Sequence, residues 1–548
     1  MIYFLKTKAD IFLKRCPKSG KIVGFRFDNT ISKIWFPVVG IFAIIWFLVR
    51  VIPKPARAAY PCQQVAAGIG IGFVSYLYFI LGSFPLFKII RNKTNLSLAK
   101  IFIIICVILV TTTIGISVNS IIRFKPNLSH IENVNTPIGD AIGIFQGRVV
   151  WMQDFNSTSW DGKNGFWWDD ANLSQQAVDK MFSNSIKALT GAKTDAEAWK
   201  KLFIFHNKKN GHGKKGYKKG ERIVIKMNCN AIGNLSPKWA DQGYPSPQMI
   251  NALIKQLIEI AGVQGSDIII TDPSRYIGEF IYNIIRSNPS PEFRQITFEQ
   301  NQAGDLPGCK TALPDTTNKI FFVMPGGEKA FLYLPQSFTD ATYQINLSLV
   351  RPHTIFAITS TAKNHFGSVY DPDLRRFNPI KLHSFAVSGI PTPNKMGDPH
   401  CSPVLLGHKT IYNKTFLYLA DGLYTANNQG GVVKRWSTMG DDWFSSILMS
   451  QDPVAIESVV LDFISSESDL INGNSCFNGN QDNGLHESAL ADNPPSGTIY
   501  DPENNGNRLK SLGVHEHWNN NTEKKYSRNL GKGKGIELIA LRGDNAKN

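Results

Sequence analysis

The sequence lacks the motifs by which the commonest cofactor sites are recognised. It has no G-x-x-x-x-G-K-[ST] loop for ATP, no G-x-S-x-G elbow of a serine esterase, and no G-x-G-x-x-G after a strand for NAD. None of its seven cysteines belongs to a C-x-x-C pair, which argues against a ferredoxin-type iron–sulfur cluster and a zinc ribbon. No cofactor is therefore indicated, although a divalent metal held by histidine and carboxylate stays compatible with the sequence.

Acidic residues are almost missing from the first 125 residues. This part carries 17 Lys and Arg but only Asp10 and Asp28, whereas the other residues carry 42 basic and 41 acidic side chains. The net charge of +16 therefore belongs to the N-terminal part. Because the large C-terminal part has no excess of positive charge, we do not expect nucleic acid to be a partner.

The same N-terminal part is rich in apolar residues. Residues 1–125 contain apolar stretches that predict a membrane anchor with spans near 34–52, 65–87 and 101–122. Lysine and arginine are dense before the first span and between the second and third. By the positive-inside rule, the N-terminus is cytoplasmic and the large domain lies beyond the inner membrane, in the periplasm. If the first stretch does not span, the same count leaves the large domain in the cytoplasm.

The composition divides the remaining chain into three parts. Residues 126–144 are typical of a linker, residues 145–470 of an α/β domain, and residues 471–548 of a loop-rich extension packed on that domain. Four of the cysteines lie in these parts, and they could form two disulfides in any of three connectivities or stay unpaired.

Four stretches repeat one design, an apolar run that ends abruptly in polar residues. They are Arg222–Asn230, Asp267–Arg275, Thr354–Gly367 and Phe416–Tyr424. Short runs of this kind are typical of strands buried on both faces of a largely parallel sheet. A helix with an apolar stripe, from Pro247 to Gly262, separates the first two and predicts a βαβ unit. The predicted fold class is therefore α/β, with a mostly parallel or mixed sheet and flanking helices, preceded by a bundle of about three transmembrane helices.

Polar residues at the ends of these strands are the candidate site, because ligands of such sheets bind beyond the carboxyl ends of the strands. The candidates for catalysis are Lys363, His365 and Lys226, and those for ligand binding are Asn228, Asn230, Asp272, Asn364, Asp421, Asp452 and Glu457. Turn formation and a structural Lys–Asp pair are the alternative roles. His400-Cys401, His486-Glu487 and His515-Glu516-His517 are further potential metal ligands, without the spacing of a zinc protease.

In their order along the chain, several of these stretches resemble a known family. IVIKMNCN, SPQMINALIKQLIEIAG, IIITDPS, TAKNHFG, ADGLY and SQDPVAIES are similar to the family catalogued as domain of unknown function 362, over roughly residues 145–540. WWDD, LHESALADNPPSGTIYDP and GVHEHWNN resemble its membrane-anchored branch in Bacteroidetes-type bacteria. The resemblance implies one recurrent set of residues: Lys226, Asn228, Lys363, Asn364, Gly367, Asp421, Asp452 and Glu457. Glu457 stands where the family usually has Asp, and the ferredoxin-like cysteines of some members are missing here.

From these features we expect a membrane-anchored extracytoplasmic α/β protein that binds and transforms an anionic small molecule or a cell-envelope component. Lys226 and Lys363 would hold the anion, and His365 would act as acid or base. Asp272, Asp421 and Glu457 would orient a metal or hydroxyl groups. The alternative is a non-catalytic scaffold or binding module of an envelope assembly.

Overall fold

The computed structural model describes residues 134–230, 232, 241–304, 306–324, 327–385 and 395–543, and the backbone of two short strands, β1 (Leu13–Arg15) and β2 (Ile22–Phe25). The chain divides into two units, residues 1–125 with 388–391 and residues 126–387 with 392–548. The three predicted membrane spans lie outside the described residues. Among those that are described, no helix is both long and apolar enough to cross a membrane.

The second unit is built on a nine-stranded sheet with the strand order β19-β4-β17-β16-β11-β5-β6-β7-β8. Its strands are β4 (Arg148–Gln153), β5 (Ile223–Lys226), β6 (Ile268–Asp272), β7 (Thr297–Gln300), β8 (Cys309–Thr311), β11 (Tyr343–Leu349), β16 (Thr415–Gly422), β17 (Ser446–Ser450) and β19 (Glu537–Arg542). Only β17 runs against its neighbours, and all other pairs are parallel. The predicted α/β class with a mostly parallel sheet is confirmed.

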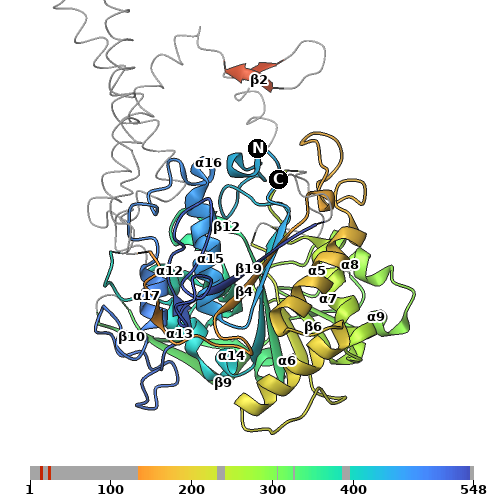
Figure 1. The fold of residues 1–548 in the computed structure, drawn as a ribbon. Helices are drawn as coiled ribbons and strands as arrows, with labels where there is room; N and C mark the ends of the chain where they lie inside the picture. The colour runs from red at the N-terminus through yellow and green to blue at the C-terminus, as the bar shows by residue number, and fades with distance from the viewer. Residues whose placement is uncertain are drawn as a thin grey trace, which may run out of the picture. The chain divides into compact units, whose positions relative to one another are not determined.

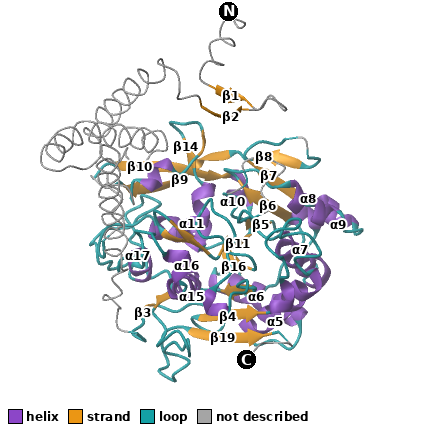
Figure 2. Ribbon diagram, turned by 90° about the horizontal axis from the view of Figure 1, so that it is seen from above, coloured by secondary structure: helices purple, strands orange, loops and turns teal. Residues whose placement is uncertain are grey.

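Helices cover both faces of this sheet, as Figure 2 shows in a view along it. One face carries α5 (Gln175–Thr190), α6 (Asp195–Lys209), α7 (Pro247–Lys255) and α8 (Glu279–Arg286), and the other α11 (Thr361–Asn364), α13 (Ser402–Gly407), α15 (Pro453–Ser466) and α17 (Asn483–Ala489). Successive strand residues point to opposite faces. In β16, Tyr418 and Ala420 therefore join one core, whereas Leu417 and Leu419 join the other.

Local sequence signals explain where these helices begin and end. The Ser174 side chain accepts the Ala177 N–H at the start of α5, and Gly191 ends this helix with a φ of 60°. At the start of α15, Asp452 accepts N–H groups of the first turn and Pro453 occupies its first position. The predicted helix from Pro247 is α7, which continues as a π-helical segment over Gln256–Ile260.

One of the four predicted strands does not belong to the main sheet. Within Thr354–Gly367 only β13 (Ala357–Thr359) is extended, and it pairs with β12 (Arg351–His353) in a hairpin outside the main sheet. Ala357 has a φ of 60°, so the chain turns sharply there and the apolar run cannot continue as one strand. The sheet position beside β16 is filled instead by β11, which the sequence analysis did not identify.

The C-terminal residues complete the main sheet. Strand β19 is its edge strand beside β4, and β18 (Val514–His515) pairs with β3 (Ile138–Gly139). Figure 1 shows β19, in dark blue, beside the early strand β4. A separate four-stranded sheet contains β9 (Pro314–Val323), β10 (Lys329–Pro335), β14 (Tyr370–Asp371) and β15 (Arg376–Phe377). Among the open cysteine alternatives, the structure has free thiols at Cys229, Cys309, Cys401 and Cys476.

Candidate functional site

A cavity of about 200 Å³ lies at the carboxyl ends of β5 and β6. Of the predicted site residues it brings together Asn228, Asn230, Asp272, Lys363 and Asn364. Other residues of its wall are Ser274, Arg275, Arg351, His353, Thr359, Gly367, His383 and Gln429. The wall thus combines the strand ends with the β12–β13 hairpin and α11, at the edge of the sheet where ligand sites of α/β proteins form. We call this cavity the anion pocket.

Lys226 lies behind the wall of the anion pocket and has a carboxylate partner. Its side chain is 1% exposed, and its Nζ is 3.4 Å from Asp272 Oδ2. The same Nζ donates to Asn364 Oδ1 at 3.2 Å and to the carbonyl of Met227. Burial lowers the pKa of Lys226, and Asp272 partly opposes this shift. Asp272 also accepts the N–H of Cys229 at 2.8 Å, so the contacts are those of a structural Lys–Asp pair.

His365 is enclosed in the same network and does not belong to the wall of the pocket. Asn364 donates to Asn346 Oδ1 at 2.8 Å, and the Asn346 amide lies 3.0 Å from His365 Nε2. Asn346 therefore donates to this nitrogen. His365 is 1% exposed, and its burial, with the nearby Lys226, lowers its pKa to about 3. This geometry gives His365 a structural place, and the histidines in the wall of the pocket are His353 and His383.

Lys363 belongs to the wall of the pocket, and among the residues described no carboxylate forms an ion pair with its amine. Its Nζ lies 3.3 Å from the ring centre of Phe366 and 3.3 Å from His383 Nε2. His383 Nδ1 is 3.0 Å from the carbonyl of Pro379, so Nδ1 carries the proton and Nε2 accepts from the lysine. Burial lowers the pKa of Lys363 well below its usual value, and Arg351 and Arg275 lower it further. The amine is therefore easier to deprotonate than that of a surface lysine.

Two arginines, both missed in the sequence analysis, add positive charge to the pocket. Arg351 is 1% exposed, and it donates to the carbonyl of Gly243 and to Asn228 Oδ1, each at 3.2 Å. Its Nε has no partner among the residues described, and burial lowers its pKa to about 10. Arg275 donates to Asn230 Oδ1 at 2.8 Å. No ion pair within 4.0 Å joins either guanidinium to a carboxylate of the described chain.

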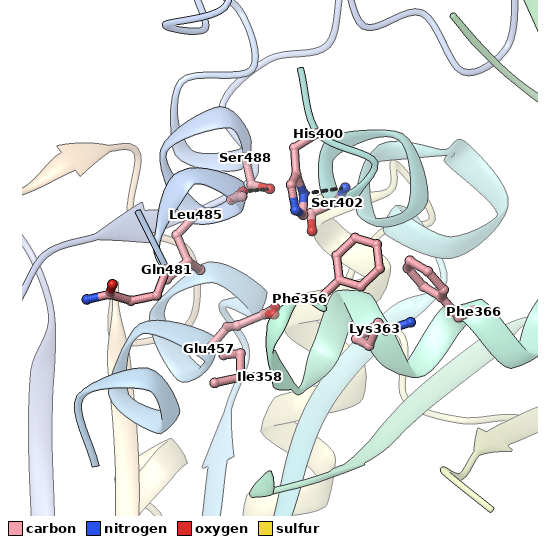
Figure 3. Close-up of a pocket in the computed structure, with 11 residues that line it drawn as sticks. Phe356, Ile358, Lys363, Phe366, His400, Ser402, Glu457, Gln481, Leu485 and Ser488 are labelled. Carbon is pink, nitrogen blue, oxygen red and sulfur yellow. Dashed lines mark hydrogen bonds between the residues drawn. The ribbon is translucent and has the colours of Figure 1, made fainter. Parts of the chain in front are cut away.

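A second, smaller cavity of about 30 Å³ lies on the other side of Lys363 (Figure 3). Its wall includes Phe356, Phe366, His400, Ser402, Glu457, Gln481, Gly484, Leu485 and Ser488. Glu457, which projects from α15, accepts the hydroxyl of Thr361 and the N–H of Ala362 at 3.2 Å. Burial raises the pKa of Glu457 to about 7. Glu457 therefore holds the start of α11, the helix that carries Lys363, and does not reach the anion pocket.

Asp421 and Asp452 lie outside both cavities. Asp421 accepts N–H groups of Ser246 at 2.7 Å and of Leu423 at 3.1 Å, which ties the start of α7 to the end of β16. Asp452 accepts four backbone N–H groups, those of Val454, Ala455, Ile142 and Val514. Both carboxylates connect separate segments of backbone, a structural role.

Asp272, Asp421 and Glu457, predicted to orient a metal or hydroxyl groups, bind separate backbone segments and do not form a common ligand set. Among the residues described, one group of His, Cys, Asp and Glu side chains has ligand atoms within 4.8 Å of one another, namely Asp482, His486 and His515. None of these three belongs to the wall of the anion pocket. The pocket is therefore built for a ligand that cationic and amide groups recognise.

Comparisons with known proteins find a family model that matches the central region of the chain. No curated protein matches the chain. A solved structure, that of the lactate racemase apoprotein from Thermoanaerobacterium thermosaccharolyticum, aligns with 11% identity and a TM-score of 0.26 over 61% of this chain and 63% of the other. The chain thus spans less than two thirds of that structure, and so low a score supports no functional argument. Residues 223–462, which contain the whole anion pocket, match the family model described as "Domain of unknown function (DUF362)", and this match supports the family that the motifs indicated.

Proposed function

We propose that the anion pocket binds a small organic anion, a carboxylate or a phosphate ester, and that Lys363 exchanges a proton with it. The observation that carries the proposal is the convergence of Arg275, Arg351 and Lys363 on one cavity in which the carboxylate of Asp272 is already paired with Lys226. The cavity therefore has an excess of positive charge that an anionic ligand would balance.

The energetics of burial favour such a ligand. A buried cation without a counter-charge is destabilising by several kcal/mol, roughly, even after relaxation. A carboxylate or phosphate can accept two parallel hydrogen bonds from one guanidinium, which gives both strength and orientation. The volume of about 200 Å³ fits a compact metabolite better than a polymer, because pockets for drug-sized ligands begin at about 300 Å³.

The proton transfer rests on the surroundings of Lys363. Apolar rings and a neutral histidine surround its amine, and the lowered pKa makes the neutral amine available as a base. With Lys363 as the base, the rate would rise with pH through a pKa well below the usual lysine value. His383, whose Nε2 contacts the amine, would keep Lys363 in position.

The test is ligand-induced stabilisation of the full-length protein by small carboxylates and phosphate esters. We expect one chemical class to raise the melting temperature saturably, and Arg351→Gln to weaken that ligand about 100-fold, as expected for loss of a charge-assisted hydrogen bond worth about 2–3 kcal/mol. Arg508→Gln is the matched control, because Arg508 is an exposed arginine that donates to the carbonyl of Asp492.

Two results would decide against the proposal: no anion that stabilises the wild type, or an anion that stabilises Arg351→Gln equally well. If an anion binds, its chemical conversion is then measured by mass spectrometry after incubation with the wild type and with Lys363→Met. Binding without conversion by the wild type would favour the alternative, a non-catalytic binding module.

We further propose that residues 1–125 anchor the protein in the inner membrane, that the pocket faces the periplasm, and that the ligand is an envelope component or its precursor. The charge distribution of the N-terminal part and the resemblance to the membrane-anchored branch support this placement. Reporter fusions at the C-terminus test it: alkaline phosphatase should be active there and green fluorescent protein dark. The reverse pattern would place the pocket in the cytoplasm.

A further inference from the structure

A cluster of three histidines and two aspartates lies where the C-terminal residues pack on α15. Asp462 belongs to α15, Asp482 and His486 lie at and just after the start of α17, and His515 and His517 flank the end of β18. None of the five belongs to the wall of either cavity that contains Lys363. We call these five residues the histidine cluster.

The ligand atoms of the cluster converge on one carboxylate oxygen. Asp482 Oδ2 lies 3.7 Å from His486 Nε2 and 3.9 Å from His515 Nε2. In a tetrahedral zinc site, N and O ligands about 2.0–2.1 Å from the metal lie roughly 3.3–3.5 Å from each other. The ligand atoms of all three side chains lie within 4.8 Å of one another, so the side chains would need to draw closer together to share one ion.

The hydrogen-bond partners of His515 set the correct tautomer for a ligand. The Ser458 hydroxyl donates to the carbonyl of Val454 at 2.7 Å, so its oxygen accepts from His515 Nδ1 at 2.8 Å. The proton of His515 is then on Nδ1, and the lone pair of Nε2 points toward Asp482. A ligating histidine whose other nitrogen donates to the protein is the usual arrangement in metal sites.

A second layer of contacts holds the carboxylate. His517 Nε2 lies 3.2 Å from Asp482 Oδ2, and its Nδ1 lies 2.5 Å from Asp462 Oδ1. Asp462 accepts in turn from the hydroxyl of Tyr526 at 2.7 Å. The cluster thus has an inner set and an outer set of partners, as metal sites do.

We propose that Asp482, His486 and His515 bind a divalent transition-metal ion, zinc by the chemistry of the donors, with water as the fourth ligand and His517 holding Asp482 from outside. Imidazole with one carboxylate suits zinc, nickel, copper or iron rather than magnesium or calcium. The side chains of His515 and Asp482 are 1% and 4% exposed, whereas those of His486 and His517 are 12% and 17% exposed. The ion would therefore enter past His486 and His517.

The ion would fix one wall of the smaller cavity. Gln481, Gly484, Leu485 and Ser488, on and just before α17, contact that cavity, while Asp482 and His486 project into the cluster. A metal shared with His515 would tie α17 to β18, and the Ser458 contact would extend the tie to α15, which carries Glu457. Metal binding would in this way stabilise the packing around Lys363 without contacting the ligand of the anion pocket.

The experiment measures metal in the full chain, purified in mild detergent through a tag that contains no histidine. We expect stoichiometric zinc by elemental analysis and, after chelation, a saturable cobalt(II) absorption spectrum of a four-coordinate site. Asp482→Asn and His515→Gln should lose both, and Asp462→Asn should bind about 10–100-fold more weakly. His408→Gln is the matched control: His408 is a buried histidine elsewhere, beside the carbonyl of Lys319, and this variant should keep both the zinc and the cobalt spectrum.

A stability measurement completes the test. Chelation should lower the melting temperature of the wild type and of His408→Gln, but not that of Asp482→Asn, because only the former two have the ion to lose. A wild type with neither zinc nor a cobalt spectrum, or ligand variants that bind as much metal as the wild type, would overturn the proposal. If a ligand variant fails to fold, the cobalt titration of the chelated wild type decides alone.

Discussion

The two lysines that sequence reasoning placed in one site occupy regions of opposite character. Around Lys226 each polar group has a partner: Asp272 balances its charge, and Asn364 connects it to Asn346 and His365. Around Lys363 the neighbours are the rings of Phe356 and Phe366 and a neutral histidine. Both amines have lowered pKa values, so the shift alone does not separate them. Their partners do, and this difference supports the proposal that Lys226 maintains the fold while Lys363 meets a ligand.

The largest expected effect is on stability, and it has opposite outcomes for the two lysines. Lys226→Met leaves the carboxylate of Asp272 buried without its counter-charge, so we expect the free energy of unfolding to fall by about 3–5 kcal/mol. Lys363→Met removes a desolvated cation that has no carboxylate partner, so the change should be within about 1 kcal/mol or stabilising. Urea denaturation of both variants measures the difference. Equal losses in the two would show that the two regions are not distinct.

A smaller effect is expected at Gly367, which lies between the two regions. A Cβ at this position would lie 2.6 Å from Asp272 Oδ1 and 3.1 Å from Lys226 Nζ. Gly367→Ala should therefore push the Lys226–Asp272 pair apart and cost about 1–3 kcal/mol of stability. Gly216→Ala, where a Cβ meets nothing within 4 Å, is the control in the same denaturation assay. If Gly367→Ala matches the control, the Lys226–Asp272 pair tolerates displacement and does not require a glycine at position 367.

The strand ends were predictable from sequence because parallel strands place their carboxyl ends at one edge. Asn228, Asn230 and Asp272 follow directly from that rule and contact the anion pocket. Strand β11 was missed because Gln344, Asn346 and Ser348 alternate with its apolar residues, so it has no continuous apolar run. Arg351, which begins the next strand, β12, was missed with it. The polar residues of β11 are nevertheless buried, since Asn346 bonds to Asn364 and Ser348 to the carbonyl of Leu419. These hydrogen bonds join residues that are far apart in the sequence, so the sequence of the strand alone does not reveal them.

The roles of individual residues were less predictable than their positions. Asp-Pro at 452 marks a helix start and Asp-Gly at 421 marks a turn in the sequence, and the structure has both aspartates bound to backbone N–H groups. His365 follows Lys363 by two residues, yet α11 ends at Asn364 between them and the imidazole turns inward to Asn346. Which of two neighbouring polar residues faces a cavity depends on the packing of a single helical turn, and the residue types do not encode it.

The smallest predicted effect is the pH dependence of the stability that Glu457 contributes. This dependence tests the difference between Lys226 and Lys363. Burial raises the folded-state pKa of this carboxyl from about 4.5 to about 7, so the folded protein binds its proton more tightly than the unfolded chain does. The stabilisation is then complete below pH 4.5 or so and is lost as the pH rises through about 7. Between about pH 5 and pH 6.5 the free energy of unfolding of the wild type should fall by about 1–2 kcal/mol relative to Glu457→Gln. Were Glu457 the hidden counter-ion of Lys363, its pKa would be lowered instead, and the difference between the wild type and Glu457→Gln would stay almost constant over the same range. Lys363 would then be a paired lysine like Lys226, so the slope of this difference with pH decides which description of Lys363 is correct.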